Sequence, residues 1–152
     1  MHRVIILRHA KAEQFAETDH ARPLSNRGHQ QAKECSEWLK TLPFTIDHAL
    51  VSSSKRTIET WEDLKINSTV TISDDAYNAS AEDLVHLIRH TNDGSLNLLV
   101  IAHNPGVSDL AFANGFAGEL STCSAVVIEC EGELVQFGLI ESKPAETFRP
   151  AD

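Results

Sequence analysis

Two short runs of apolar residues constrain the fold of this chain more than any other feature. They span residues 4–7 (Val-Ile-Ile-Leu) and residues 97–102 (Asn-Leu-Leu-Val-Ile-Ala). Neither run shows the alternation of apolar and polar residues that marks a strand with one face in water. Runs of this kind are typical of parallel strands that are buried on both faces. The sequence therefore predicts a parallel sheet that is covered on both sides by helices.

The rest of the chain alternates between helical and strand patterns. Helices are expected over residues 26–42, 55–64, 81–90 and 104–115, and further strands over residues 48–51 and 70–72. Residues 125–130 and 134–140, joined by a Glu-Gly-Glu turn, indicate a hairpin. This order predicts an α/β fold, a three-layer α/β/α sandwich with a mostly parallel sheet and an antiparallel edge hairpin.

The length of 152 residues favours one domain. We expect this domain to span residues 1–141 and residues 142–152 to form a loose tail that contains Pro144 and Pro150. Hydrophobic residues make up 41% of the chain and charged residues 23%, the balance of an ordinary globular protein. A monomer is the expected state.

Composition also limits where the protein acts and what it binds. No apolar run approaches the roughly 20 residues of a membrane-spanning helix, and the N-terminus does not resemble a secretory signal. The protein is therefore expected to stay in the cytoplasm, away from membranes, with its three cysteines reduced. The net charge of −9 argues against nonspecific nucleic-acid binding.

Polar side chains of a matching kind follow three of the expected strands. They are Arg8 and His9, Ser52 with Arg56 four residues later, and His103 with Asn104. Because ligands bind beyond the carboxyl ends of parallel strands, we expect these side chains to converge at one sheet edge. Arg22, in the loop after the first strand, can reach the same region.

This group of residues is suited to phosphate. Arginine presents a planar fork of donors that matches phosphate oxygens, and the helix N-termini near residues 53–56 and 104–106 add backbone N–H groups. Asn104 is therefore counted among the phosphate ligands. A neutral imidazole can attack phosphorus, and nearby positive charge keeps that imidazole neutral by lowering its pKa.

We assign His9 as the nucleophile because it ends the first strand beside Arg8. His103 would hydrogen-bond a phosphoryl oxygen and stabilise the transition state. Since arginines and histidines supply the required charge, no metal or other cofactor is expected. Ser52 is expected to cap the following helix and to support the site.

Four segments resemble motifs of the histidine phosphatase (phosphoglycerate mutase-like) superfamily, in the correct order. Residues 7–10 (LRHA) resemble its RHG signature, 22–28 (RPLSNRG) its RPL[ST]xxG segment, 52–60 (SSSKRTIET) its S-x-x-x-R-x-x-x-T segment and 102–104 (AHN) its second histidine motif. One departure is Ala10, which replaces the usual glycine. The short length and the D-x-x-R-P-L pattern at residues 19–24 are most similar to the SixA branch of phosphohistidine phosphatases.

The resemblance implies a phosphoglycerate mutase-like fold and a hydrolase that becomes phosphorylated on His9. It implies that Arg8, Arg56 and His103 bind phosphate and that Arg22 is a further ligand. The family also suggests a partner: a phosphorylated protein such as a histidine phosphotransfer domain or a phosphocarrier.

The substrate depends on whether the site holds a general acid, which larger relatives carry as a glutamate. An alkoxide leaving group needs a proton, whereas an imidazole leaves more readily because its conjugate acid has a pKa near 6.5. Asp74, Asp75 and Glu82 are candidate acids, with Asp75 foremost. However, residues 75–79 resemble the compact region of SixA-type proteins, which lack an obvious acid. The sequence therefore favours phosphohistidine on another protein.

Three alternatives stay open at this point. The chain could hydrolyse small phosphate monoesters with Asp75 as the acid. It could be a noncatalytic phosphate-binding module or a metal-dependent hydrolase. His86 and His90, four residues apart on a predicted helix, could contact a metal, but no acidic or cysteine partner is evident.

Overall fold

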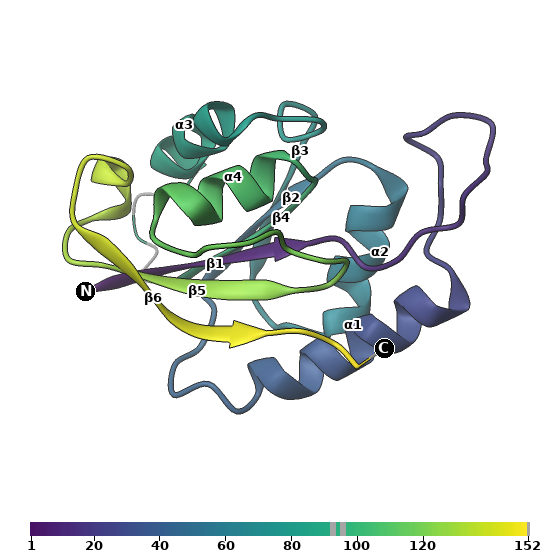
Figure 1. The fold of residues 1–152 in the computed structure, drawn as a ribbon, viewed down its shortest axis with the longest axis horizontal. Helices are drawn as coiled ribbons and strands as arrows, with labels where there is room; N and C mark the ends of the chain where they lie inside the picture. Colours follow the sequence, from purple (N-terminus) through teal and green to yellow (C-terminus); the bar gives the residue numbers. More distant parts are fainter. Residues whose placement is uncertain (92–93, 95–96, 152) are drawn as a thin grey trace.

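Strand β1 (His2–Arg8) lies inside a six-stranded sheet of the order β3-β2-β4-β1-β5-β6 (Figure 1). The computed structural model describes residues 1–91, 94 and 97–151. The other strands are β2 (His48–Ser52), β3 (Thr69–Ser73), β4 (Asn97–Ala102), β5 (Ala125–Cys130) and β6 (Ser142–Phe148). Strand β1 is parallel to β4 and antiparallel to β5, while β2 is parallel to β3 and β4. The predicted mixed sheet is confirmed.

Helices cover both faces of this sheet. They are α1 (Asn26–Leu39), α2 (Lys55–Leu64), α3 (Ala81–Thr91), α4 (Gly106–Ala113) and the short 3₁₀ helix η1 (Leu134–Gln136). Figure 1 shows α3 and α4 on one face and α1 and α2 on the other. Successive residues of β1 alternate between the two cores: Val4 and Ile6 pack toward α3 and α4, while Ile5 and Leu7 pack toward α1 and α2. The predicted α/β/α sandwich is confirmed.

The C-terminal region differs from the prediction. Residues 134–140, expected as the second strand of a hairpin, form η1 and turns, with Val135 and Leu139 exposed. The antiparallel partner of β5 is β6, which begins where a loose tail was expected. The expected tail, and with it the boundary at residue 141, is therefore wrong.

Strand β6 escaped prediction because it is an edge strand with few apolar side chains. Pro144 and Lys143 lie within it, and most of its residues are exposed or half-buried. An edge strand is held by backbone pairing and tolerates charge and proline. Phe148, at its end, stacks on Trp38 of α1 with ring centroids 5.3 Å apart.

The β1–α1 loop (residues 9–25) extends beyond the carboxyl end of β1 (Figure 1). Its two ends are held together by an antiparallel bridge between Ala12 and Leu24 and by a bond from Ser25 N to Lys11 O of 3.0 Å. A side chain at Gly28 would place its Cβ 2.0 Å from Lys11 O, so only glycine allows α1 to approach the loop this closely. The loop therefore leaves and rejoins the fold through a narrow neck.

No helix in the part of the chain that the structure describes is long and apolar enough to cross a membrane.

Candidate active site

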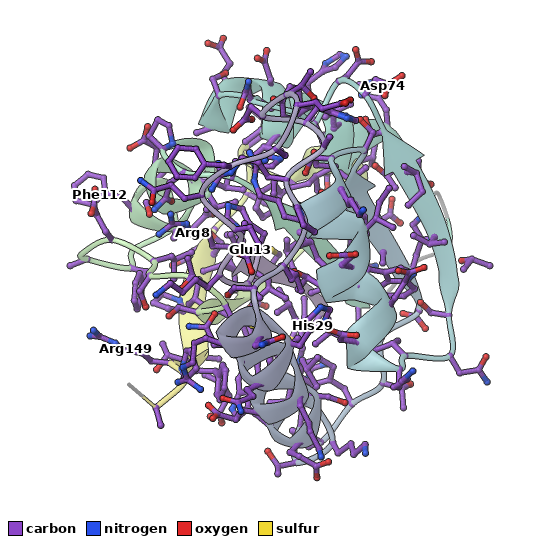
Figure 2. The ribbon with its side chains drawn as sticks, turned by 90° about the vertical axis from the view of Figure 1, so that its right-hand side faces the viewer. Arg8, Glu13, His29, Asp74, Phe112 and Arg149 are labelled. Carbon is purple, nitrogen blue, oxygen red and sulfur yellow. The ribbon has the colours of Figure 1, made fainter. Side chains whose placement is uncertain are left out.

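The carboxyl ends of β1, β2 and β4 lie at the end of the sheet that the β1–α1 loop overhangs. Figure 2 views the molecule from this side, with Arg8 and Glu13 near the middle and the loop crossing in front of the strand ends. His9 N donates to Ala102 O over 3.1 Å, which couples the first residue after β1 to the last residue of β4. The rings of His9 and His103 consequently lie 5.3 Å apart between centroids.

The protonation of His9 is fixed by its neighbour. Its Nδ1 lies 2.7 Å from Ala10 O, and because a carbonyl only accepts, Nδ1 carries the ring proton. The lone pair is therefore on Nε2. Burial, followed by the charges of Arg56, Arg8 and Arg22, lowers the pKa of His9 to about 4. His9 is a neutral base at neutral pH.

Ala10, the residue that departs from the family signature, is itself held in place. Its N–H donates to Thr60 Oγ1 over 3.0 Å, and Thr60 Oγ1 donates to Arg56 O over 2.7 Å. Arg56 and Thr60 lie one turn apart on α2, so the same helix holds Arg56 and supports the backbone next to His9. This contact gives a physical reason for the spacing of the S-x-x-x-R-x-x-x-T segment.

His103 has the opposite tautomer. Its Nδ1 lies 3.2 Å from Arg56 Nη2, which only donates, and its Nε2 lies 2.8 Å from Ser52 Oγ. Nε2 therefore carries the proton and donates to Ser52. Burial, then the charges of His9 and Arg56, lowers the pKa of His103 to about 3. Ser52 supports the site by orienting this ring, and it also accepts from Thr57 Oγ1 through its carbonyl.

The three predicted arginines all reach this region. Arg56 is 5% exposed and donates from Nη1 to Asp19 O over 2.8 Å. Arg22 donates from Nη1 to Asp19 Oδ1 over 2.9 Å. Arg8 donates to Leu120 O over 3.3 Å, and burial lowers its pKa although nearby Glu119 opposes that effect.

Asp19 and Tyr77 complete the site, although neither was a predicted site residue. Arg56 Nη2 donates to Asp19 Oδ2 over 3.1 Å, and Tyr77 OH donates to the same oxygen over 2.5 Å. The hydrogen bond from Tyr77, then that from Arg22, holds the pKa of Asp19 well below its usual range. The spacing of Asp19 and Arg22 was visible in the sequence, but their meeting with α2 depends on the path of the loop.

Asn104 is engaged within the protein. Its Nδ2 donates to Leu120 O over 2.9 Å, and its Oδ1 accepts from Ser108 Oγ over 2.6 Å. The structure thus places Asn104 beside Arg8, with which it shares the Leu120 carbonyl. This contact holds the segment around residue 120 against the site.

None of the three candidate acids forms a hydrogen bond or ion pair with His9 or His103. Asp75 is exposed and has no hydrogen bond or ion pair with any described residue. Asp74 lies at the margin of the face shown in Figure 2, away from Arg8. Glu82 borders a separate cavity of about 420 Å³ that also involves His86. Among the described residues, no group of three or more His, Cys, Asp or Glu side chains is placed to hold a metal ion.

The site thus brings two neutral imidazoles, those of His9 and His103, together with three arginines. Comparisons with known proteins identify the family of the chain. The family model of the histidine phosphatase superfamily (branch 1) matches residues 4–77. Phosphohistidine phosphatase SixA of Escherichia coli (strain K12) is 32% identical over 113 residues, which cover 70% of each chain.

Solved structures share the fold over nearly the whole chain. A protein of Nakamurella multipartitia assigned as phosphohistidine phosphatase SixA superposes with a TM-score of 0.92 at 18% identity, covering 99% of this chain and 97% of that one. The protein histidine phosphatase SixA complexed with tungstate gives a TM-score of 0.83 at 23% identity, covering 97% of both. The chain belongs to the histidine phosphatase superfamily, in the branch of the SixA phosphohistidine phosphatases.

Proposed function

We propose that this phosphatase removes phosphoryl groups from histidine side chains of a protein through a covalent intermediate on His9. The observation that carries the proposal is the bond from His9 Nδ1 to Ala10 O, which leaves the Nε2 lone pair free to attack. The surrounding arginines would bind the phosphoryl oxygens and stabilise charge in the transition state.

The same bond prepares the second step of the reaction. Attack by Nε2 forms an N–P bond on His9 and breaks the P–N bond of the substrate, whose electron pair returns to the substrate ring. Phospho-His9 retains its proton on Nδ1, held by Ala10 O. When water attacks phosphorus, the pair of the N–P bond returns to Nε2, a neutral imidazole is restored and dihydrogen phosphate leaves.

His103 would change its role when the phosphoryl group binds. In the described structure its Nδ1 accepts from Arg56, so it offers no proton on that side. A phosphoryl dianion beside the ring raises the pKa of His103, because the anion favours the protonated form. Nδ1 then becomes a donor to a phosphoryl oxygen.

The carboxylates at the site support a phosphohistidine substrate over a phosphate ester. Asp19 contacts Arg56 but is held ionised by its donors, so it has no proton to give. Asp75 is exposed and forms no hydrogen bond or ion pair with the described site residues. An imidazole leaves without a general acid more readily than an alkoxide. The relative from Escherichia coli is itself a phosphohistidine phosphatase.

The proposed partner is a histidine phosphotransfer domain or a phosphocarrier protein. We propose that the phosphatase acts on it as a monomer in the cytoplasm. The three described cysteines are free thiols, which agrees with a reducing compartment. A shallow cavity of about 350 Å³, lined by His20, Ser53 and Glu59 among others, adjoins the site and offers room for a protein surface.

Trapping of the phosphoenzyme tests this function. Incubation with a ³²P-labelled phosphohistidine protein, followed by rapid alkaline quenching, should leave acid-labile label on the wild-type chain. His9→Ala should carry none, while His90→Ala, which alters an exposed histidine of α3, should be labelled like the wild type. Because arginines supply the charge, EDTA should not change turnover.

Other outcomes would favour the alternative functions. Label on His9→Ala would contradict the assigned nucleophile. Bound orthophosphate without any trapped phosphoenzyme would indicate a binding module. Efficient hydrolysis of sugar phosphates that is lost in Asp75→Asn would indicate a monoester phosphatase.

A further inference from the structure

Asp19 receives three donors from three separate parts of the chain. Arg22 Nη1 donates to Oδ1 over 2.9 Å, while Arg56 Nη2 and Tyr77 OH donate to Oδ2 over 3.1 Å and 2.5 Å. Among the ion pairs of the described residues, those of Asp19 alone involve Arg22 or Arg56. A carboxylate has therefore been built into the arginine cluster of a phosphate site.

This carboxylate still has room for a ligand. A carboxylate offers about four acceptor positions, and the protein occupies three of them, which leaves one on Oδ1. The side chain of Asp19 is 49% exposed, so this position is open to a molecule that enters the site. Arg56 Nη2 contacts both Asp19 and His103, so the open position on Asp19 and the His103 ring lie on either side of the same guanidinium group.

We infer that Asp19 accepts a hydrogen bond from the free ring N–H of the substrate's phosphohistidine and thereby selects phosphohistidine over phosphate esters. This inference rests on the proposed function. It assigns Asp19 to the leaving group, whereas the arginines bind the phosphoryl group.

The chemistry of the leaving group explains why such a contact is useful. One nitrogen of the substrate ring bears phosphorus, and the other must bear a proton if the ring is to leave as neutral imidazole. When His9 Nε2 forms its bond to phosphorus, the pair of the old P–N bond goes to the substrate nitrogen, and the proton stays on the other nitrogen. A fixed negative charge at that N–H favours the protonated, reactive form.

The two imidazoles of the reaction then receive matching support. His9 keeps its remote proton on Nδ1 through the Ala10 carbonyl. The substrate ring would keep its own through the Asp19 carboxylate. Phosphate esters gain nothing from Asp19 at the leaving group, because an ionised carboxylate cannot protonate an alkoxide.

The experiment compares Asp19→Asn with wild type on two substrates. One is a peptide that carries phosphohistidine, and the other is 4-nitrophenyl phosphate, whose leaving group needs no proton. We expect kcat/KM for the peptide to fall by about tenfold or more, the value of a lost charge-assisted hydrogen bond. Because Asp19 also contacts Arg22 and Arg56, kcat/KM for the ester should fall as well, but by a factor at least about threefold smaller than that for the peptide. For the peptide, the alkaline limb of kcat should move to lower pH in the variant.

Two further measurements keep the result clear. Asp109→Asn makes the same change at an exposed position of α4 and should leave both substrates unaffected. The wild type alone provides a second test, with a phosphoimidazole methylated on its remote nitrogen, which has no N–H to donate. For each compound, the rate enhancement is the enzymatic rate divided by the rate of uncatalysed hydrolysis. This enhancement should be about tenfold larger for the unmethylated compound.

Each other outcome overturns the inference. Equal losses on both substrates would mean that Asp19 only orients the arginines, and unchanged rates would mean that it does not touch the leaving group. Equal acceleration of the methylated and unmethylated compounds would also mean that Asp19 does not contact the leaving group. If the wild type hydrolyses the ester but no phosphohistidine, the proposed function fails, and this inference fails with it.

Discussion

Two neighbouring histidines of this site hold their protons on different nitrogens, and their neighbours decide each case. The Ala10 carbonyl keeps the proton of His9 on Nδ1. Arg56 donates to Nδ1 of His103, so the proton of that ring lies on Nε2, where the Ser52 hydroxyl accepts it. In the proposed mechanism, the nitrogen that attacks and the nitrogen that later binds the phosphoryl group are therefore selected before any substrate arrives.

Histidine ¹⁵N NMR can check this assignment directly. At pH 7 both His9 and His103 should be neutral, His9 as the Nδ1–H tautomer and His103 as the Nε2–H tautomer. Lowering the pH should begin to protonate His9 only near pH 4, since its pKa is lowered to about 4. In Ser52→Ala the preference of His103 should relax while that of His9 persists. A charged His9 at pH 7 would contradict the mechanism.

The sequence predicted the residues of this site that adjoin strand ends and helix starts. Arg8 is the last residue of β1, His9 and His103 directly follow β1 and β4, and Arg56 stands in the first turn of α2. The topology of a parallel sheet therefore suffices to bring them together. The roles of Asp19 and Tyr77 could not be predicted in this way. Both lie between elements, and the long-range contacts that place them have no local signal.

At the scale of elements, prediction succeeded where burial leaves a pattern in the sequence. The strand over residues 97–102 and the helix over residues 55–64 were predicted with the bounds that the structure shows, because uniform or periodic apolar residues mark both. The prediction missed strand β6 because this strand pairs with β5 through backbone groups, which every residue carries. The apolar Val135 and Leu139 in turn suggested a strand that is not there, although they lie exposed.

The contribution of β6 to stability can be measured through Phe148. Phe148→Ala should lower the free energy of unfolding by about 1–2 kcal/mol, because it removes a half-buried ring from its stack on Trp38. Phe15→Ala is the matched control, since this ring is 82% exposed in the β1–α1 loop and its loss should change stability by less than about 0.5 kcal/mol. Urea unfolding of both variants provides the comparison. Equal effects would contradict the docking of β6 against α1.

Charge is unevenly distributed over the whole molecule. The chain has a formal net charge of −9, yet Arg8, Arg22 and Arg56 gather at one end of its sheet. The resulting contrast in potential would attract an anionic group such as a phosphoryl group to that end.

The buried histidines also make the stability of the whole molecule sensitive to acid. The pKa values of His9 and His103 are lowered to about 4 and about 3, whereas an unfolded histidine titrates near 6.5. Between these values the unfolded state binds more protons, so stability falls as the pH is lowered through this window.

From pH 7.5 to pH 5.5, the free energy of unfolding should decrease by about 1 kcal/mol for each of the two histidines. Urea unfolding at several pH values checks this, and His9→Ala should show a shallower dependence than the wild type. An equal slope in the variant would mean that His9 titrates normally in the folded protein.

The narrow neck of the β1–α1 loop has a consequence for how this enzyme can be altered. Because the Ala12–Leu24 bridge closes the loop on itself, its length and composition are uncoupled from the registration of the sheet. Asp19, which we infer recognises the leaving group, lies inside the closed segment together with its partner Arg22. Exchange of the segment between these two residues is therefore a route to new substrates that leaves the nucleophile and its strand untouched.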